Sequence, residues 1–162
     1  MATTYEPIAT TTLGSAQSSV TFSSISSGFT DLVLICQGKM VSGTAINNKI
    51  QFNGDTGTNY SRTFMYGTGA NAYSGRASSV SFLGFPYWDA NSSMTIVQIM
   101  NYSNETTYKT ALSRNSQPAE TVTAEVGLWR NTAAINSITI SRGSTNDFAS
   151  GSTFTLYGIA SA

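Results

Sequence analysis

Alternation between apolar and polar residues at a period of two constrains this fold more than any other feature of the chain. Residues 92–159 contain four or five such runs in succession, separated by Asn, Ser, Gly, Pro or Asp. No stretch shows a sustained apolar period of 3.6 residues, and residues 133–135 could form one helical turn at most. We therefore interpret residues 92–159 as an antiparallel half-sheet on which the rest of the chain packs.

The first half of the chain carries further strand patterns. Apolar runs, alternating or continuous, predict strands over residues 19–25, 31–39, 47–53, 62–66 and 78–83. The run 31–39 is nearly continuous, which predicts a central strand covered on both faces. About eight to ten short strands with frequent turn signals predict an all-β fold, a two-sheet antiparallel sandwich that is jelly-roll-like.

Two strands of the half-sheet show which residues share a face. One face of the first strand carries Met94, Ile96, Gln98 and Met100, and the other carries Thr95, Val97, Ile99 and Asn101. In a later strand the apolar residues are Val122, Ala124, Val126 and Leu128. They alternate with Thr123, Glu125 and Gly127.

At 162 residues, the chain is predicted to form one folded domain with a hydrophobic core. Residues 1–18 are polar, rich in Thr and Ser and interrupted by proline, so we predict an extended N-terminal arm. A single β-sandwich domain follows over residues 19–162. The candidate anchors of the arm are Tyr5, Ile8 and Leu13. The arm either adds to a neighbouring sheet or subunit or is a loose terminus.

The residue types present exclude several kinds of chemistry. The absence of histidine excludes imidazole acid–base catalysis, Ser–His pairs and imidazole metal sites. The single cysteine, Cys36, lies in an apolar run, and we expect a buried, inert thiol. Residues 53–59 faintly resemble a calcium loop but lack its downstream Glu, which favours a glycine-rich hairpin loop. We predict no catalytic, cofactor-binding or metal-binding residue and no enzyme, although a glycosidase-type carboxylate pair could still form in space.

Charge and composition indicate the class of partner. The formal net charge is zero and 10% of residues are charged, against roughly 25% in typical domains. A neutral surface built from hydroxyls and amides suits permanent packing against copies of the chain or against another protein. Lys and Arg are scattered singly, which is untypical of a nucleic-acid-binding protein. Neither a signal peptide nor a membrane-length apolar run is visible, so we expect synthesis in a cytoplasm and no membrane partner.

Residues 84–90 (GFPYWDA) combine three aromatic residues with a proline, which is typical of a loop with unusual apolar content. Phe85, Tyr87 and Trp88 either form a platform for a sugar or a protein partner, or pack over the end of the sandwich. Together with the three arm residues, they are the candidate partner-binding residues of this sequence.

Five segments carry a family resemblance. They are TTYEPIATTTLGSAQSSVTFSSI, FNGDTGTNYSRT, IMNYSNETTYKTALSR, LWRNTAAINSITI and FASGSTFTLYGI. In residues and in order they resemble small virion structural proteins, and repeated modules of larger ones, from tailed bacteriophages of aquatic and cyanobacterial hosts. The resemblance covers nearly the whole chain and brings no catalytic residues with it.

The resemblance implies a place in the virion. The expected role is that of a capsid decoration (cement) protein on the outer surface of the head, acting as a homo-oligomer such as a homotrimer. Its partners would be other copies of the chain and the major capsid protein. The alternative is a tail-fibre or baseplate protein that binds host-surface glycan, for which Tyr87 and Trp88 beside Asp89 and Asn91 would serve. A depolymerase-type glycosidase is the third alternative for the function of the chain.

Overall fold

The computed structural model describes residues 4–43, 46–118 and 121–160, apart from the side chains of residues 46, 85 and 86. Within these ranges the chain forms strands and no helix, which confirms the predicted all-β class. The strands are β1 (Tyr5–Thr12), β2 (Ser19–Phe22), β3 (Asp31–Gly38), β4 (Ile46–Phe52), β5 (Tyr60–Gly67), β6 (Ala72–Val80), β7 (Leu83–Trp88), β8 (Ser93–Met100), β9 (Lys109–Gln117), β10 (Thr121–Trp129), β11 (Ile138–Ser141) and β12 (Thr153–Ile159).

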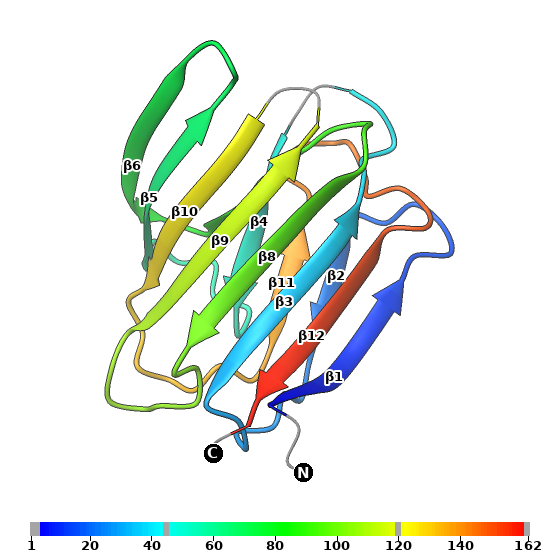
Figure 1. The fold of residues 1–162 in the computed structure, drawn as a ribbon. Helices are drawn as coiled ribbons and strands as arrows, with labels where there is room; N and C mark the ends of the chain where they lie inside the picture. The colour runs from blue at the N-terminus through cyan, green and yellow to red at the C-terminus, as the bar shows by residue number, and fades with distance from the viewer. Residues whose placement is uncertain (1–3, 44–45, 119–120, 161–162) are drawn as a thin grey trace.

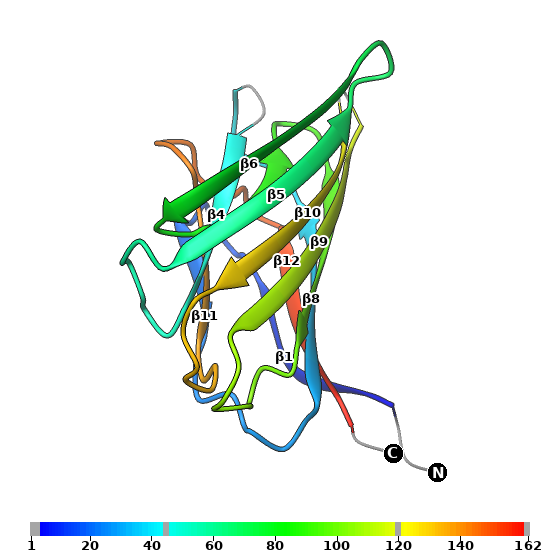
Figure 2. The same cartoon turned by 90° about the vertical axis from the view of Figure 1, so that its left-hand side faces the viewer.

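These strands form two antiparallel sheets that pack face to face. The larger sheet has the order β1-β12-β3-β8-β9-β10-β5-β6, and the smaller has the order β2-β11-β4-β7. Figure 1 shows the eight-stranded sheet in front of the smaller one, and Figure 2 shows the two layers after a quarter turn. The predicted two-sheet antiparallel sandwich is therefore confirmed, with more strands than the sequence indicated.

The predicted half-sheet over residues 92–159 is only partly correct. Strands β8, β9 and β10 are neighbours in the large sheet, as expected for successive antiparallel strands. However, β11 lies in the small sheet, and β12 returns to the large sheet between β1 and β3. The segment between β10 and β11 is held at the crossing by the Asn53 side chain, which donates to the Ala134 carbonyl and accepts from two backbone N–H groups.

Two predictions about irregular segments are corrected. The N-terminal segment forms an edge strand of its own sheet, where β1 pairs with β12 from Tyr5–Ile159 to Thr12–Thr153. Residues 84–90 were predicted to be a loop, but most of them belong to β7, which pairs with β4. Proline is tolerated there because β7 is an edge strand and its register shifts between Ile46 and Asn48.

Two aromatic clusters fill the space between the sheets. Trp88, Phe148 and Phe154 pack with ring centroids 5.3–5.8 Å apart. The second cluster joins Phe52, Tyr60 and Trp129 at 5.6–6.3 Å. All six side chains are fully buried, and each contributes about 1.5–3 kcal/mol through the loss of apolar surface to water. These clusters fix which face of the large sheet points inward.

Candidate docking surface on the eight-stranded sheet

The face of the large sheet that points away from the small sheet is called the outer face below. In β8 the alternation is as predicted: Thr95, Val97 and Ile99 are buried against the small sheet. On the opposite side, Met94 and Met100 are 44% and 46% exposed. No described segment covers them, so β8 presents large apolar side chains to its surroundings (Figure 1).

Strand β10 reverses the usual orientation of an alternating strand. The ordinary rule places apolar side chains toward the core and polar ones toward solvent. Here Thr123 and Glu125 are buried, whereas Val122 is 69% exposed and Val126 is 50% exposed. A shift of one residue in register would exchange the two sets, so the observed orientation is a property of this sequence that needs a cause.

The cause lies in the close approach of β7 to β10. A Cβ atom at Gly127 would lie 2.6 Å from Leu83 Cδ2, so any larger residue at this inward position would displace the Leu83 side chain. Two residues farther along, and therefore on the same face, Trp129 is fully buried. On the same face Glu125 Oε1 accepts a hydrogen bond of 2.8 Å from the Gly84 backbone N–H. These three inward contacts fix the register and leave the apolar stripe outside.

The pairing register shows how the outer side chains adjoin one another. One row across the sheet runs Val33, Gln98, Leu112, Val126 and Thr63. The next row runs Ile35, Ile96, Arg114, Ala124 and Met65. A third row includes Met94, Ser116 and Val122. Of the nine large apolar side chains that are exposed within the described residues, six lie on this face: Tyr5, Met65, Met94, Met100, Val122 and Val126.

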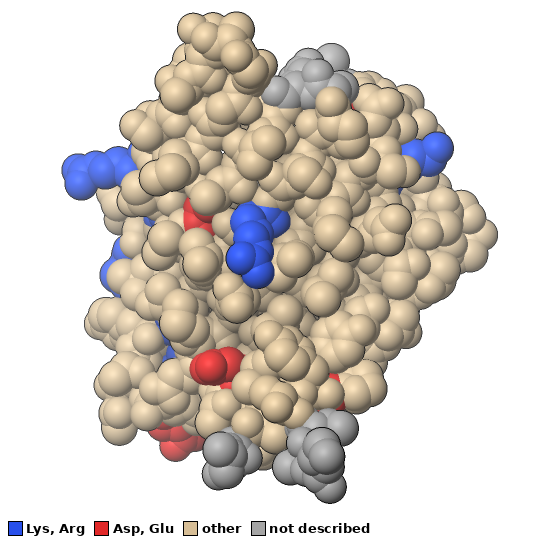
Figure 3. Space-filling view, in the orientation of Figure 1, with Lys and Arg blue, Asp and Glu red and all other residues tan. Residues whose placement is uncertain are grey.

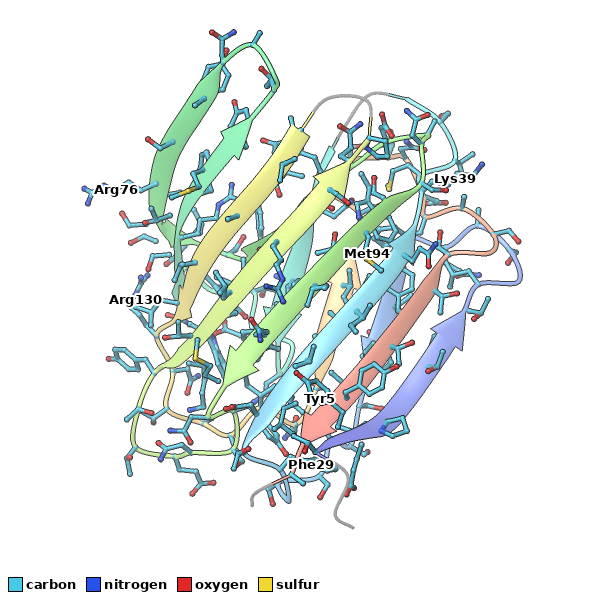
Figure 4. All side chains as sticks on the ribbon, viewed as in Figure 1. Tyr5, Phe29, Lys39, Arg76, Met94 and Arg130 are labelled. Atoms are coloured by element: carbon cyan, nitrogen blue, oxygen red, sulfur yellow. The ribbon has the colours of Figure 1, made fainter. Side chains whose placement is uncertain are left out.

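Few charges interrupt the outer face. Figure 3 shows few charged atoms on it: one basic patch near the middle, with small acidic areas beside and below it. By register, Arg114 is exposed between Ile96 and Ala124. The side chains of Lys39 and Arg76 lie at the two rims, on either side of the centrally placed Met94 (Figure 4).

Two hollows shape this surface. The larger has a volume of about 430 Å³ and lies over β5, β6, β9 and β10, where small hydroxyl side chains form its floor. Its lining includes Thr63, Ser78, Thr110, Val126 and Leu128. The smaller, of about 270 Å³, lies beside β1 and is lined in part by Tyr5, Val33 and Met100. The outer face therefore carries projecting methionines next to depressions.

The outward side of the small sheet provides a contrast within the same molecule. Most of its core-facing residues are apolar, as in Ile138 and Ile140, and Asn48 is a buried polar exception. The alternate positions, which point outward, are polar: Ser19, Thr21, Lys49, Gln51, Thr139 and Ser141. Thr21 and Thr139 form a cross-strand hydrogen bond of 3.0 Å between their hydroxyls. Among the side chains that the structure describes, large exposed apolar residues are thus gathered on one outer face of the sandwich and not on the other.

The candidate residues of the predicted arm divide between surface and core. Tyr5 is exposed on the outer face, with its ring centroid 6.4 Å from that of Tyr157. Ile8 is half-buried and packs against the core, and Leu13 is a buried core residue. Leu13 was expected to anchor a partner, but its side chain offers no surface to one because the chain turns inward after β1.

The two candidate aromatic residues whose side chains are described, Tyr87 and Trp88, do not form an exposed platform. Trp88 is fully buried and donates from Nε1 to Thr95 Oγ1 at 2.9 Å, so its expected role as a surface contact is wrong. Tyr87 is half-buried, and the side chain of Phe85 lies outside the described part of the structure. Asp89, the carboxylate expected to flank the platform, is buried and accepts from Gln117 Nε2 at 2.6 Å.

The ionisable groups inside the sandwich have structural partners. Burial raises the pKa of Glu125, and the Arg62 guanidinium 3.3 Å away opposes this by favouring the carboxylate. Burial raises the pKa of the Cys36 thiol well above its usual value. The carboxylate of Asp55 accepts hydrogen bonds from the Trp129 indole and the Gly57 N–H, which closes the loop before β5 on itself. The described residues contain no group of three or more Cys, Asp or Glu able to hold a metal ion.

Comparison with known proteins adds no family: no protein-family model matches the chain, and no curated protein is significantly similar to it. Within the described ranges, no helix has the length and apolar character needed to span a membrane.

Sequence reasoning missed the outer face, although one signal for it was present. In β10, Trp129 is in phase with Thr123, Glu125 and Gly127. A large aromatic residue that shares a face with the polar residues indicates that this face is the buried one. The glycine at an inward position indicates the same.

Proposed function

We propose that this chain is a bacteriophage virion structural protein, a capsid decoration (cement) protein that stabilises the head shell as a homo-oligomer. The observation that carries the proposal is the outer face, where Val122 and Val126 point outward while Thr123 and Glu125 are buried. An apolar sheet face of this size marks a surface that another protein covers. The resemblance of the sequence to small phage structural proteins supports a virion as the setting.

The proposed mechanism is the burial of surface between neighbouring subunits. Each contact removes apolar side chains such as Met94 and Val126 from water, at about 25 cal/mol per Å². A partner that binds only the closed shell stabilises it by mass action, and opening the shell must break many such contacts together. The low charge of the chain suits this role because closely packed copies repel one another little.

A tail-fibre or baseplate role in binding host-surface glycan is the second candidate. One observation favours it: Tyr73 is exposed and its ring stacks on that of Tyr66, with centroids 4.9 Å apart. Both tyrosines lie near the tip of the β5–β6 hairpin, which projects beyond the rest of the sandwich in Figure 1. Exposed aromatic faces of this kind can stack on sugar rings.

Electron microscopy of the phage particles that contain the chain separates the two roles. Decoration predicts many symmetric copies on the outer surface of the head. Density confined to the tail tip would reject it. A host-cell adsorption assay with purified protein, comparing wild type with Tyr73→Ala, tests the second role. Adsorption that the substitution abolishes would favour glycan binding, and no adsorption at high protein concentration would reject it.

A further inference from the structure

We propose that the outer face is covered by a second copy of this chain, through its own outer face. The proposal rests on the proposed function, because it names the partner of that same surface. Three properties of the outer face support a second copy: its area, its charges and its shape.

The area of the outer face matches the requirement of a stable protein contact. Eight strands about 4.8 Å apart, each about 26 Å long at ~3.3 Å per residue, give a sheet of roughly 34 by 26 Å. The resulting area of roughly 900 Å² compares with about 800 Å² per partner in standard interfaces. A contact through most of this one face therefore suffices for a stable pair.

The outer face carries few charges, and they are of both signs. Arg114 is exposed on β9, and Asp31 lies half-buried at the start of β3 on the same side of the sheet. Two copies can therefore pair Arg114 of one with Asp31 of the other, in the reciprocal way that a self-complementary interface allows. The other charges are few and scattered: Arg76 pairs with Thr63 at one edge of the face, and Lys39 lies at the opposite rim (Figure 4), so a strongly acidic or basic partner would find no continuous patch here.

The shape of the outer face is also self-complementary in kind. The hollow of about 430 Å³ is lined in part by Thr110, which pairs with the projecting Met100 on β8, and Met94 projects at the opposite end of the same strand. In a contact between two copies, each supplies both a projection and a depression, so one surface can provide both halves of the fit. Methionine is suited to such a surface because its unbranched, polarisable side chain adapts to irregular gaps.

The outward side of the small sheet is less suited to a contact between copies than the outer face of the large sheet. Its outward positions are polar, with Thr21 and Thr139 already hydrogen-bonded to each other. Packing there would bury hydroxyls and amides that gain little from leaving water. The contact between copies therefore uses the large sheet and leaves the small sheet for water or for other partners.

Sedimentation analysis of the purified chain, from low micromolar to near-millimolar concentration, tests the proposal. Wild type is expected to associate. Val126→Lys is expected to weaken association by at least ~10-fold, because it buries an unpaired charge in the contact. Val41→Lys is the matched control, since Val41 is 55% exposed against 50% for Val126 but lies outside the sheets. Circular dichroism confirms that each variant is folded.

A second variant acts by shape and not by charge. Thr63 is exposed on the floor of the larger hollow, so Thr63→Trp fills the depression without touching the core. It is expected to weaken association as Val126→Lys does. Wild type that stays monomeric at the highest concentration, or outer-face variants that associate as tightly as Val41→Lys, would overturn the proposal.

These outcomes are separate from those of the proposed function. A monomeric wild type that decorates phage heads would refute the contact between outer faces and leave the decoration role intact. A chain that associates through the outer face but is absent from phage heads would refute decoration and leave the contact intact.

Discussion

Two buried threonines on neighbouring parts of the large sheet predict opposite effects of the same substitution. Thr95 is fully buried, accepts from Trp88 Nε1 at 2.9 Å and donates to Asn115 Oδ1 at 2.7 Å. Thr123 is 4% exposed, and its hydroxyl has no hydrogen-bond partner among the described residues. Replacing either threonine by valine removes one hydroxyl and preserves the shape of the side chain.

The expected magnitudes follow from the number of groups left unpaired. Thr95→Val leaves the Trp88 indole N–H and the Asn115 carbonyl oxygen without the hydroxyl, at about 1–3 kcal/mol for each buried group. We therefore expect a loss of about 2–6 kcal/mol in the free energy of unfolding. Thr123→Val removes a buried hydroxyl whose desolvation is not offset, so we expect a gain of about 1 kcal/mol.

Urea unfolding followed by tryptophan fluorescence measures both variants against wild type, with equal m-values required for the comparison. The sign of the difference is the critical result. If Thr123→Val destabilises the protein as much as Thr95→Val does, the inward side of β10 is not the costly polar face that we describe.

Three further predictions concern single positions. Burial acts to raise the pKa of Asp55, but hydrogen bonds from Trp129, Asn59 and Gly57 outweigh it and lower that pKa. The carboxylate therefore stabilises the fold at pH values above the ordinary Asp pKa of about 3.9, and this stabilisation is lost as the pH falls through the lowered pKa of the folded state. The difference in unfolding free energy between wild type and Asp55→Asn should shrink between these two pH values. The Cys36 thiol, fully buried and with a raised pKa, should react with a disulfide reagent only after unfolding, and fast reaction in the native protein would contradict this. Gly84→Ala should cost about 1–3 kcal/mol in thermal or urea unfolding, because its Cβ would lie 2.7 Å from a Glu125 carboxylate oxygen, whereas Gly14→Ala, with open space around it, should cost far less.

Periodicity in the sequence was sufficient for the fold class because it is a local property. Alternation predicted strands at β2, β8 and β10, and a nearly continuous apolar run predicted β3. Alternation also divided the residues of β8 between its two faces correctly. It could not place the strands in sheets. The pairing of Tyr5 with Ile159 joins the two ends of the chain, and no local pattern indicates such a contact.

The candidate site was missed for a related reason. Alternation states which residues share a face but leaves open which face is inward. In β10 that choice depends on contacts with distant segments, namely Leu83 against Gly127 and the Gly84 N–H on Glu125. The aromatic segment around Trp88 was misinterpreted because aromatic residues near a proline are typical of a surface loop. The pairing of β7 with β4 instead places Trp88 inside the sandwich.

The central claim is that the outer face is covered when the protein is in its assembled state. Oxidation by dilute hydrogen peroxide, quantified by mass spectrometry, tests it directly on Met65, Met94 and Met100, which are all exposed on this face. Met40 is fully buried in the core and serves as the internal control. We predict that the three outer methionines oxidise readily in the dilute free protein and several-fold more slowly in the assembly, while Met40 stays slow in both. Equal oxidation of the outer methionines in the two states would contradict the claim.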